Sequence, residues 1–250
     1  MNQECKLAGQ IALVTGGARR VGAQIARTLH AAGANVAIHC HRSMEDAQRL
    51  AAELDQARHG SACVLRADLR DLSALPTLVA GACERFGGLN LLVNNASTFY
   101  PTPLGTLTPA QWQDLIGTNL QAPLFLAQAA AAPLRASRGA LINIVDIHGM
   151  RPLRDHTVYS VAKAGLIMLT RALARELAPE VRVNGIAPGA VLWPQNGIDE
   201  QRRQRILEQT ALHRPGSPAD IARTVLFFAA DAPFVTGQIL AVDGGRSIGW

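Results

Sequence analysis

The chain has few cysteines, and none of the four is arranged as a metal or redox site requires. Cys5, Cys40, Cys63 and Cys83 lie far apart, and neither a C-x-x-C pair nor a zinc-type Cys/His spacing occurs. This excludes a zinc finger and a thioredoxin-like motif, and we expect no metal site. We interpret the cysteines as reduced, mostly buried thiols in a reducing compartment.

A long apolar segment is also missing. The most apolar stretch, residues 122–134, is interrupted by Pro123 and Pro133 and is shorter than the ~20 residues that cross a membrane. Residues 1–6 lack the apolar region of a secretory signal. We therefore expect a cytoplasmic protein without a membrane partner.

Charge of one sign is not concentrated in any part of the sequence. The formal net charge is +5, from 24 Lys and Arg against 19 Asp and Glu, and the positive residues are scattered. This argues against a nucleic-acid partner and leaves two interpretations, weak steering of an anionic ligand or ordinary surface charge. Aromatic residues are only 4% of the chain, so an aromatic side chain near a binding site is informative.

What the chain does contain is a regular alternation of short apolar runs and helical patterns. The runs predict strands, and the longer segments between them predict helices. Because the runs are apolar on both faces, they favour a parallel sheet covered by helices, an α/β fold in a single domain over residues 1–250. Residues 190–215 look polar and irregular, and we predict a substrate lid there. The predicted strands are 11–14, 34–40, 62–66, 89–93, 140–145, 181–186 and 238–242, and the predicted helices are 21–32, 44–58, 72–86, 109–134, 158–177 and 218–230.

A glycine-containing loop, residues 15–22, joins the first strand to the first helix. Gly16 and Gly22 permit a tight turn, and the helix beginning near Arg20 and Val21 offers free N–H groups to a pyrophosphate. Such a loop alone also occurs without a ligand, and the strand–helix context makes a nucleotide site the better interpretation.

The end of the second strand indicates which nucleotide would bind. An NAD site usually has an acidic residue there for the ribose 2′-hydroxyl, whereas this chain has His41, Arg42 and Ser43. Arginine and serine suit a 2′-phosphate, so NADP is favoured over NAD; the alternative is a solvated basic turn. Asp68, followed by Leu69, ends the third strand and either accepts from the adenine amino group or caps a helix.

Tyr159 and Lys163 are four residues apart on a predicted helix and therefore share one face. A neighbouring ammonium favours the phenolate, so we expect the pKa of Tyr159 to be lowered and the phenol to act as a proton donor. Asp146 stands thirteen residues before Tyr159, where a hydroxyl would suit an ordinary ketone. A carboxyl group suits ring N–H groups or proton relay to a ring nitrogen; the alternative is a helix-capping aspartate.

Together these residues resemble the short-chain dehydrogenase/reductase family over nearly the whole chain. The resemblance implies a Rossmann-type, doubly wound parallel sheet of seven strands in the order 3-2-1-4-5-6-7, and a homotetramer. The motifs that carry it are the loop 15–22, Asn94-Asn95-Ala96, Asn119, the Tyr159/Lys163 pair, Pro188-Gly189 and Val242-Asp243-Gly244-Gly245.

Two departures from the common family pattern resemble the pteridine reductase branch. Arg20 replaces the usual middle glycine of the loop, and Asp146 replaces the usual serine. Residues 41–43 and 95–103 are similar to that branch too. The branch reduces pterins and folates with NADPH, so the resemblance implies a small-molecule pterin or folate substrate.

The resemblance also implies roles for individual residues. Phe99 is similar to the aromatic residue that stacks on the pterin, and Asn119 to the residue that supports a water-linked proton path to Lys163. Without the resemblance, Phe99 could equally be a loop-packing residue. The implied cofactor-binding set is Gly16, Arg20, Val21, Gly22, His41, Arg42, Ser43, Asp68, Leu69, Asn95, Ala96, Ser97, Tyr159, Lys163, Pro188 and Gly189. The implied substrate-binding set is Arg20, Ser97, Phe99, Asp146, Tyr159 and Leu192.

We therefore expect an NADPH-dependent reductase of dihydropterins or dihydrofolate, with oxidised pterin as a further substrate. Asp146, Tyr159, Lys163 and Asn119 are the expected catalytic residues. Two alternatives stay open at this point: a carbonyl reductase of a keto-acyl thioester or small ketone, and an inert NADP(H)-sensing protein.

Overall fold

The computed structural model describes residues 5–193 and 199–249, and its centre is one parallel sheet of seven strands. The strand order is β3-β2-β1-β4-β5-β6-β7, which confirms the predicted Rossmann-type α/β fold in a single domain. The strands are β1 (Ile11–Val14), β2 (Asn35–Cys40), β3 (Ala62–Arg66), β4 (Leu91–Asn94), β5 (Ala140–Ile144), β6 (Arg182–Pro188) and β7 (Ile239–Val242).

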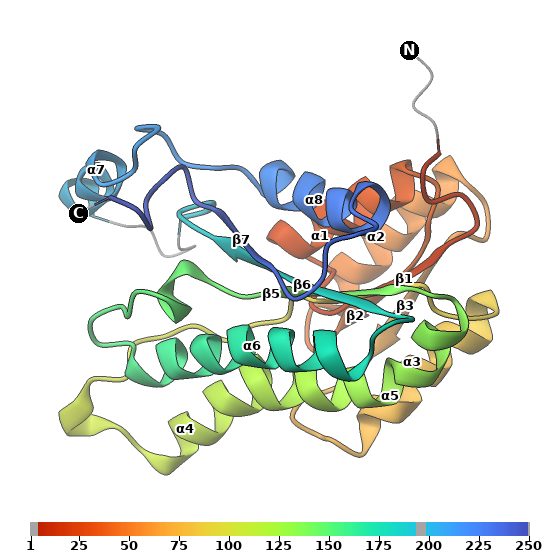
Figure 1. The fold of residues 1–250 in the computed structure, drawn as a ribbon, viewed down its shortest axis with the longest axis horizontal. Coiled ribbons are helices and arrows are strands. Elements are labelled where there is room, and N and C mark those ends of the chain that lie inside the picture. Colours follow the sequence, from red (N-terminus) through yellow and green to blue (C-terminus); the bar gives the residue numbers. More distant parts are fainter. Residues whose placement is uncertain (1–4, 194–198, 250) are drawn as a thin grey trace.

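Helices cover both faces of the sheet (Figure 1). One layer contains α1, α2 and α8, and the opposite layer contains α3, α4, α5 and α6. The helices are α1 (Arg20–Ala31), α2 (Met44–Ala57), α3 (Ala74–Phe86), α4 (Pro109–Ile116), α5 (Ala122–Ala136), α6 (Thr157–Glu176), α7 (Glu200–Glu208) and α8 (Pro218–Leu226). Short helical turns are η1 (Leu104–Thr106), η2 (Gly117–Gln121), η3 (Ile147–Gly149) and η4 (Phe227–Asp231).

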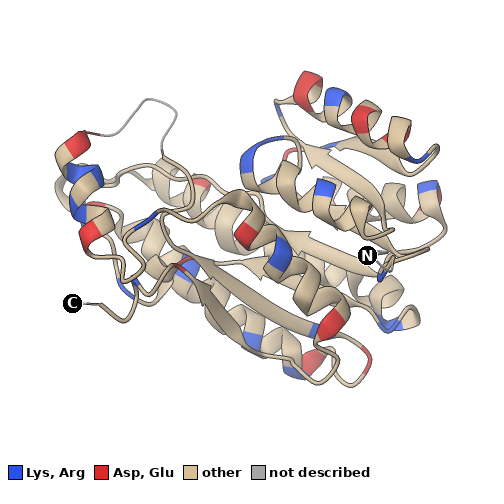
Figure 2. Ribbon diagram, turned by 90° about the horizontal axis from the view of Figure 1, so that it is seen from above, with Lys and Arg blue, Asp and Glu red and all other residues tan. Residues whose placement is uncertain are grey.

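The strands form because their side chains are apolar on both faces and both faces are covered. All residues of β1, β4 and β5 are buried. On one side the core contains Ile25 of α1, Leu50 of α2 and Phe228 of η4, and on the other Leu126 of α5. Charged residues lie mainly on the outer helices and loops rather than on the strands (Figure 2).

The prediction of one helix over residues 109–134 is wrong in detail. The segment is divided into α4, the π-helical turn η2 and α5. Pro123 has no N–H to donate to the carbonyl of Asn119, so regular α-helical bonding is interrupted there. The interruption puts Asn119 in the widened turn, 1% exposed.

The prediction of an irregular segment over residues 190–215 is also wrong in part, because α7 lies within it. Asp199 caps this nine-residue helix by accepting a hydrogen bond from the N–H of Arg202 at 3.1 Å. The helix has few apolar side chains, so its sequence shows little amphipathic periodicity. The lid stays a prediction, and residues 194–198 of it lie outside the described residues.

Within the described part of the chain, no helix combines the length and the apolar character needed to cross a membrane.

Candidate active site

A cavity of about 720 Å³ opens at the carboxyl ends of the strands. Ligands of open α/β sheets bind at this edge, where the strand order reverses between β1 and β4. Phe99 and Asn119 do not line the cavity themselves. Phe99 follows Thr98, which does line it, and Asn119 accepts a hydrogen bond from the lining residue Ser97. The cavity brings together these residues singled out from the sequence: Gly16, Arg20, Val21, Gly22, His41, Arg42, Ser43, Asp68, Leu69, Asn95, Ala96, Ser97, Asp146, Tyr159, Lys163, Pro188, Gly189 and Leu192.

The loop between β1 and α1 is held tightly against the end of β4. The side-chain amide of Asn95 donates to the carbonyls of Thr15 and Gly16, at 2.9 Å and 3.1 Å. A Cβ added at Gly22 would lie 2.1 Å from the carbonyl oxygen of Gly16, so only glycine fits there. These contacts preform the turn that leads into the N-terminus of α1, a site suited to phosphate.

His39, on β2, also supports this loop. The sequence did not indicate this contact. Its Nδ1 accepts from the N–H of Gly16 at 3.1 Å, and its Nε2 donates to the carbonyl of Ala67 at 3.2 Å. Burial is the main reason that the pKa of His39 is lowered to about 4. The imidazole is therefore neutral at physiological pH, as these two bonds require.

Arg20 occupies the place of the usual glycine with a left-handed backbone, φ 52°. This conformation is costly for a residue with a side chain, which is why glycine is common there. The guanidinium extends across the cavity and donates to the backbone carbonyl of Trp193 at 3.1 Å. It thereby links the loop to the segment after β6.

At the end of β2, His41, Arg42 and Ser43 line the cavity as expected, together with Arg19. Arg19 was not singled out from the sequence, although its position beside Arg20 in the loop was a signal. Its Nε lies 3.6 Å from a carboxylate oxygen of Asp46. The cavity therefore has a basic end that suits an anionic group.

Asp68 is engaged by Arg70 through both carboxylate oxygens, at 3.2 Å and 2.9 Å. These hydrogen bonds are the main reason that the pKa of Asp68 is lowered to about 2. Asp68 does not cap α3, whose N-cap is Ser73, so the helix-cap interpretation is wrong. Arg70 also contacts Asp114 at 3.3 Å, and Tyr100 donates to Asp114 at 3.0 Å.

Tyr159 and Asp146 are joined by a short hydrogen bond. The buried hydroxyl of Tyr159 donates to Oδ2 of Asp146 at 2.7 Å, and the N–H of His148 donates to Oδ1 at 2.8 Å. Asp146 thus also caps the short turn η3, and this cap does not prevent its contact with Tyr159. Asp146 lies two residues after the end of β5, and Tyr159 lies on α6.

The predicted lowering of the Tyr159 pKa is wrong. Burial, followed by the charge and the hydrogen bond of Asp146, raises the pKa of Tyr159 well above its ordinary value. Lys163 lies 5.7 Å from the centre of the phenol ring, and its Nζ donates to the carbonyl of Ile144 at 2.9 Å. Burial lowers the pKa of Lys163 to about 8. The phenol is therefore protonated near neutral pH, as a proton donor must be.

Asn119 holds the loop that follows β4. Its Oδ1 accepts from the hydroxyl of Ser97 at 2.6 Å, and its Nδ2 donates to the carbonyls of Thr98 at 3.0 Å and Leu115 at 2.9 Å. These three hydrogen bonds are all within the protein, and the link of Asn119 to Lys163 through water stays a prediction.

Phe99 lies beside Tyr159 and is about half exposed. Its ring meets that of Tyr159 edge-on, with centroids 4.8 Å apart and planes at 78°. The ring is also stacked on His156, for which the sequence suggested no firm role. No sequence pattern pointed to this contact, because Phe99 and His156 lie far apart in the chain.

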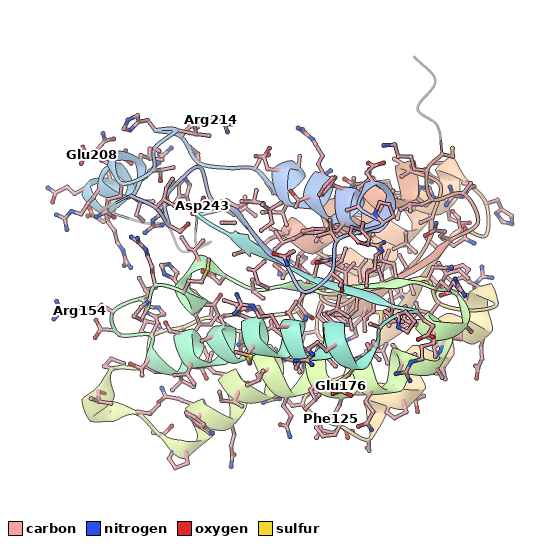
Figure 3. All side chains as sticks on the ribbon, viewed as in Figure 1. Phe125, Arg154, Glu176, Glu208, Arg214 and Asp243 are labelled. Carbon is pink, nitrogen blue, oxygen red and sulfur yellow. The ribbon has the colours of Figure 1, made fainter. Side chains whose placement is uncertain are left out.

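Arg246 is another residue that the sequence analysis did not single out. It follows the Val242–Gly245 motif, near Asp243, which accepts from the N–H groups of Gly245 and Ser247 at 2.9 Å and 2.6 Å. Burial lowers the pKa of Arg246, and the charges of Asp146 and Asp243 oppose this effect. The C-terminal segment thus brings a cation near Asp146. Figure 3 shows Asp243 at the end of the molecule that carries α7.

Comparisons with known proteins agree with this geometry. A family model described as "Enoyl-(Acyl carrier protein) reductase" matches residues 16–247. Pteridine reductase 1 of Leishmania tarentolae is 34% identical over 281 residues, covering 95% of this chain and 96% of the relative.

Two other relatives are ketoacyl reductases by name. The granaticin polyketide synthase putative ketoacyl reductase 2 of Streptomyces violaceoruber is 36% identical, covering 95% of this chain and 96% of the relative. The 3-oxoacyl-(acyl-carrier-protein) reductase FabG of Staphylococcus aureus is 34% identical, covering 94% and 96%. The chain belongs to the short-chain dehydrogenase/reductase family and is an oxidoreductase of that family.

Proposed function

We propose that this protein is an NADPH-dependent reductase of pteridines, acting on dihydropterins and dihydrofolate. The observation that carries the proposal is the contact of 2.7 Å between the hydroxyl of Tyr159 and the carboxylate of Asp146. A carboxylate at this place accepts hydrogen bonds from the N–H groups of an aminopyrimidine ring, which a ketone does not possess. The likeness to pteridine reductase 1 supports the same assignment.

The residues of the cavity fit a phosphorylated nicotinamide cofactor. The loop around Gly16 and the N-terminus of α1 would hold the pyrophosphate, and Arg19, Arg42 and Ser43 would hold a 2′-phosphate. An acidic residue for the 2′-hydroxyl of NAD is absent from residues 41–43. NADPH is therefore the proposed cofactor, and it supplies a hydride to the substrate when bound.

Proton supply falls to the residues of the chain. Tyr159 would deliver its proton to the ring nitrogen adjacent to the carbon that receives the hydride, so that a C=N bond becomes CH–NH. Asp146 would bind the aminopyrimidine edge and keep the phenol oriented through the bond at Oδ2. The ammonium of Lys163, buried beside the phenol, would stabilise the phenolate that remains and would hold the nicotinamide ribose.

Phe99 would bind the flat ring system of the substrate. Phe99 is 52% exposed although its ring lies against Tyr159, so part of the side chain is available for stacking. Offset stacking of this kind contributes roughly 0.5–1.5 kcal/mol beyond the area that it buries. Arg20, Ser97 and Leu192 line the cavity beside Phe99 and complete the proposed substrate site.

A carbonyl reductase of a keto-acyl thioester is the second candidate, because two of the relatives are ketoacyl reductases by name. Asp146 argues against it, since a carboxylate repels the oxyanion that develops when a ketone accepts hydride. An inert NADP(H) sensor is a weaker alternative, because Tyr159, Lys163 and Asn119 are all present.

The test is NADPH oxidation by the purified protein with 7,8-dihydrobiopterin, dihydrofolate and a short keto-acyl thioester in parallel. We expect turnover of the two pteridines, little turnover of the thioester, and weaker activity with NADH than with NADPH. Asp146→Ser should reduce pteridine turnover while NADPH still binds. Turnover of the thioester alone would refute the proposal, and NADPH binding without any turnover would favour the sensor.

We propose a homotetramer as well, as the family resemblance implies. Val161 and Met168 are 47% and 60% exposed on α6, and Leu124 on α5 is 39% exposed, so these helices present apolar side chains at the surface. Light scattering on the purified protein tests this, and a monomer at micromolar concentration would refute it.

A further inference from the structure

Three aromatic rings from two separate segments meet beside the cavity. Phe99, in the loop after β4, is stacked on His156 with ring centroids 4.7 Å apart and planes at 18°. Tyr159 makes a T-shaped contact with the same ring, with centroids 4.8 Å apart. Phe99 is still 52% exposed beside these two rings, so part of its side chain is left to receive a ligand.

His156 is itself well fixed. It is only 6% exposed, and its Nδ1 donates to the carbonyl of Arg154 at 2.8 Å. It is the N-cap residue of α6, and its carbonyl accepts from the N–H of Ser160 at 2.9 Å. Its backbone forms a parallel bridge with Thr102, which ties the loop of Phe99 to the start of α6. Arg154, just before His156, lies at the outer end of this region (Figure 3).

A half-exposed phenylalanine on a loop has alternative rotamers, and holding it in one rotamer costs conformational entropy. The buried, hydrogen-bonded ring of His156, packed against Phe99, restricts Phe99 to one rotamer before a ligand binds. Preorganisation of this kind improves binding, because the ordering cost is not incurred when the ligand binds.

We propose that His156 is a positioning residue for the substrate: it supports the ring of Phe99 so that a planar heteroaromatic substrate stacks on the opposite face. Stacking on Phe99 fixes the plane of the substrate ring, so that Asp146 and Tyr159 contact the edge of that ring. This inference rests on the proposed function, because only a planar ring system can stack on the supported ring of Phe99. It makes His156 a determinant of substrate affinity that does not touch the substrate.

The experiment compares His156→Leu, which fills similar space without a flat ring, with His156→Phe, which restores one. Steady-state kinetics with 7,8-dihydrobiopterin and NADPH are measured for both variants and the wild type. His156→Leu should raise the KM for the pterin by roughly threefold to tenfold, the range expected for one aromatic stack. The kcat and the KM for NADPH should change little, and His156→Phe should restore the pterin KM.

A double-mutant cycle with Phe99→Ala shows whether His156 acts through Phe99. In the Phe99→Ala background, His156→Leu should have no further effect on the pterin KM. An equal rise in both backgrounds would overturn the inference, as would an unchanged KM in His156→Leu alone. A loss of NADPH affinity and thermal stability that His156→Phe does not restore would show a purely structural role and also overturn it.

The wild-type arm separates this inference from the proposed function. Pterin turnover by the wild type together with an unaltered KM in His156→Leu overturns the role of His156 alone. Absence of pterin turnover in a wild type that binds NADPH overturns the proposed function, and the inference falls with it.

Discussion

Replacing Asp146 by asparagine removes one negative charge from beside Tyr159 and keeps the shape of the side chain. In the native site, Asp146 accepts from the phenol at 2.7 Å and from the N–H of His148 at 2.8 Å. After burial, the charge and the hydrogen bond of Asp146 are the next causes of the raised pKa of Tyr159. In Asp146→Asn, the pKa of Tyr159 should therefore fall, while burial still opposes ionisation.

The effect on activity follows from the strength of the hydrogen bonds. A hydrogen bond to a charged group contributes about 1.5–3 kcal/mol and a neutral one about 0.5–1.5 kcal/mol. Neutralising Asp146 therefore weakens each bond that it accepts by about 1–1.5 kcal/mol, a factor of roughly five to thirteen in rate. The value of kcat/KM for dihydropterin should fall by at least about fivefold in Asp146→Asn, without a change in NADPH affinity.

The small number of tyrosines makes the pKa measurable. The chain has two, and in Tyr100→Phe the phenol of Tyr159 is the only one left. Tyrosinate absorbance after a rapid pH jump, read before the protein unfolds, then reports Tyr159 alone. Tyr100→Phe should ionise at higher pH than Tyr100→Phe/Asp146→Asn. An equal ionisation midpoint of Tyr159 in the two variants, or a lower midpoint in Tyr100→Phe, would refute the proposed influence of Asp146.

Three further results are expected. Tyr159→Phe should lose roughly 10²–10⁴-fold in kcat and keep NADPH binding, measured by fluorescence titration; substantial residual turnover would exclude the phenol as the proton donor. Gly22→Ala should weaken NADPH binding, because the new Cβ would lie 2.1 Å from the carbonyl oxygen of Gly16. Gly105→Ala is the matched control, since a Cβ there would have no atom within 4 Å. Equal NADPH affinities of the two variants would contradict the tight loop. Burial lowers the pKa of Lys163 to about 8, so its ammonium is present below that pH and lost above it. The value of kcat/KM should therefore fall above about pH 8. A pH profile of kcat/KM that stays level through this region would refute the role of the charge.

Much of the fold was predictable because the responsible patterns are local. Apolar runs such as residues 140–145 predicted strands, and β5 occupies Ala140–Ile144. The spacing of Tyr159 and Lys163 predicted a shared helix face, which α6 provides. By contrast, α7 was missed because its surface is mostly polar, and the division of residues 109–134 depends on how Pro123 is accommodated.

The site was predictable as a set of residues and less so as a set of interactions. The motif positions indicated which strand ends would meet, since parallel strands end at one edge of the sheet. Two facing contacts had no sequence pattern that specified them: His39 with Gly16, and His156 with Phe99. Each depends on the packing of segments that are remote in the chain or carried by loops.

The sequence by itself determined the alternation of strands and helices along the chain, the glycine loop and the presence of a phenol, an ammonium and a carboxylate near one sheet edge. Only the tertiary structure decided the direction of the Tyr159 pKa shift. The lysine four residues away suggested lowering, but burial and the Asp146 carboxylate at 2.7 Å raise it. The physical reason is that desolvation and charge interactions depend on distance and burial in space, which residue spacing along the chain does not specify.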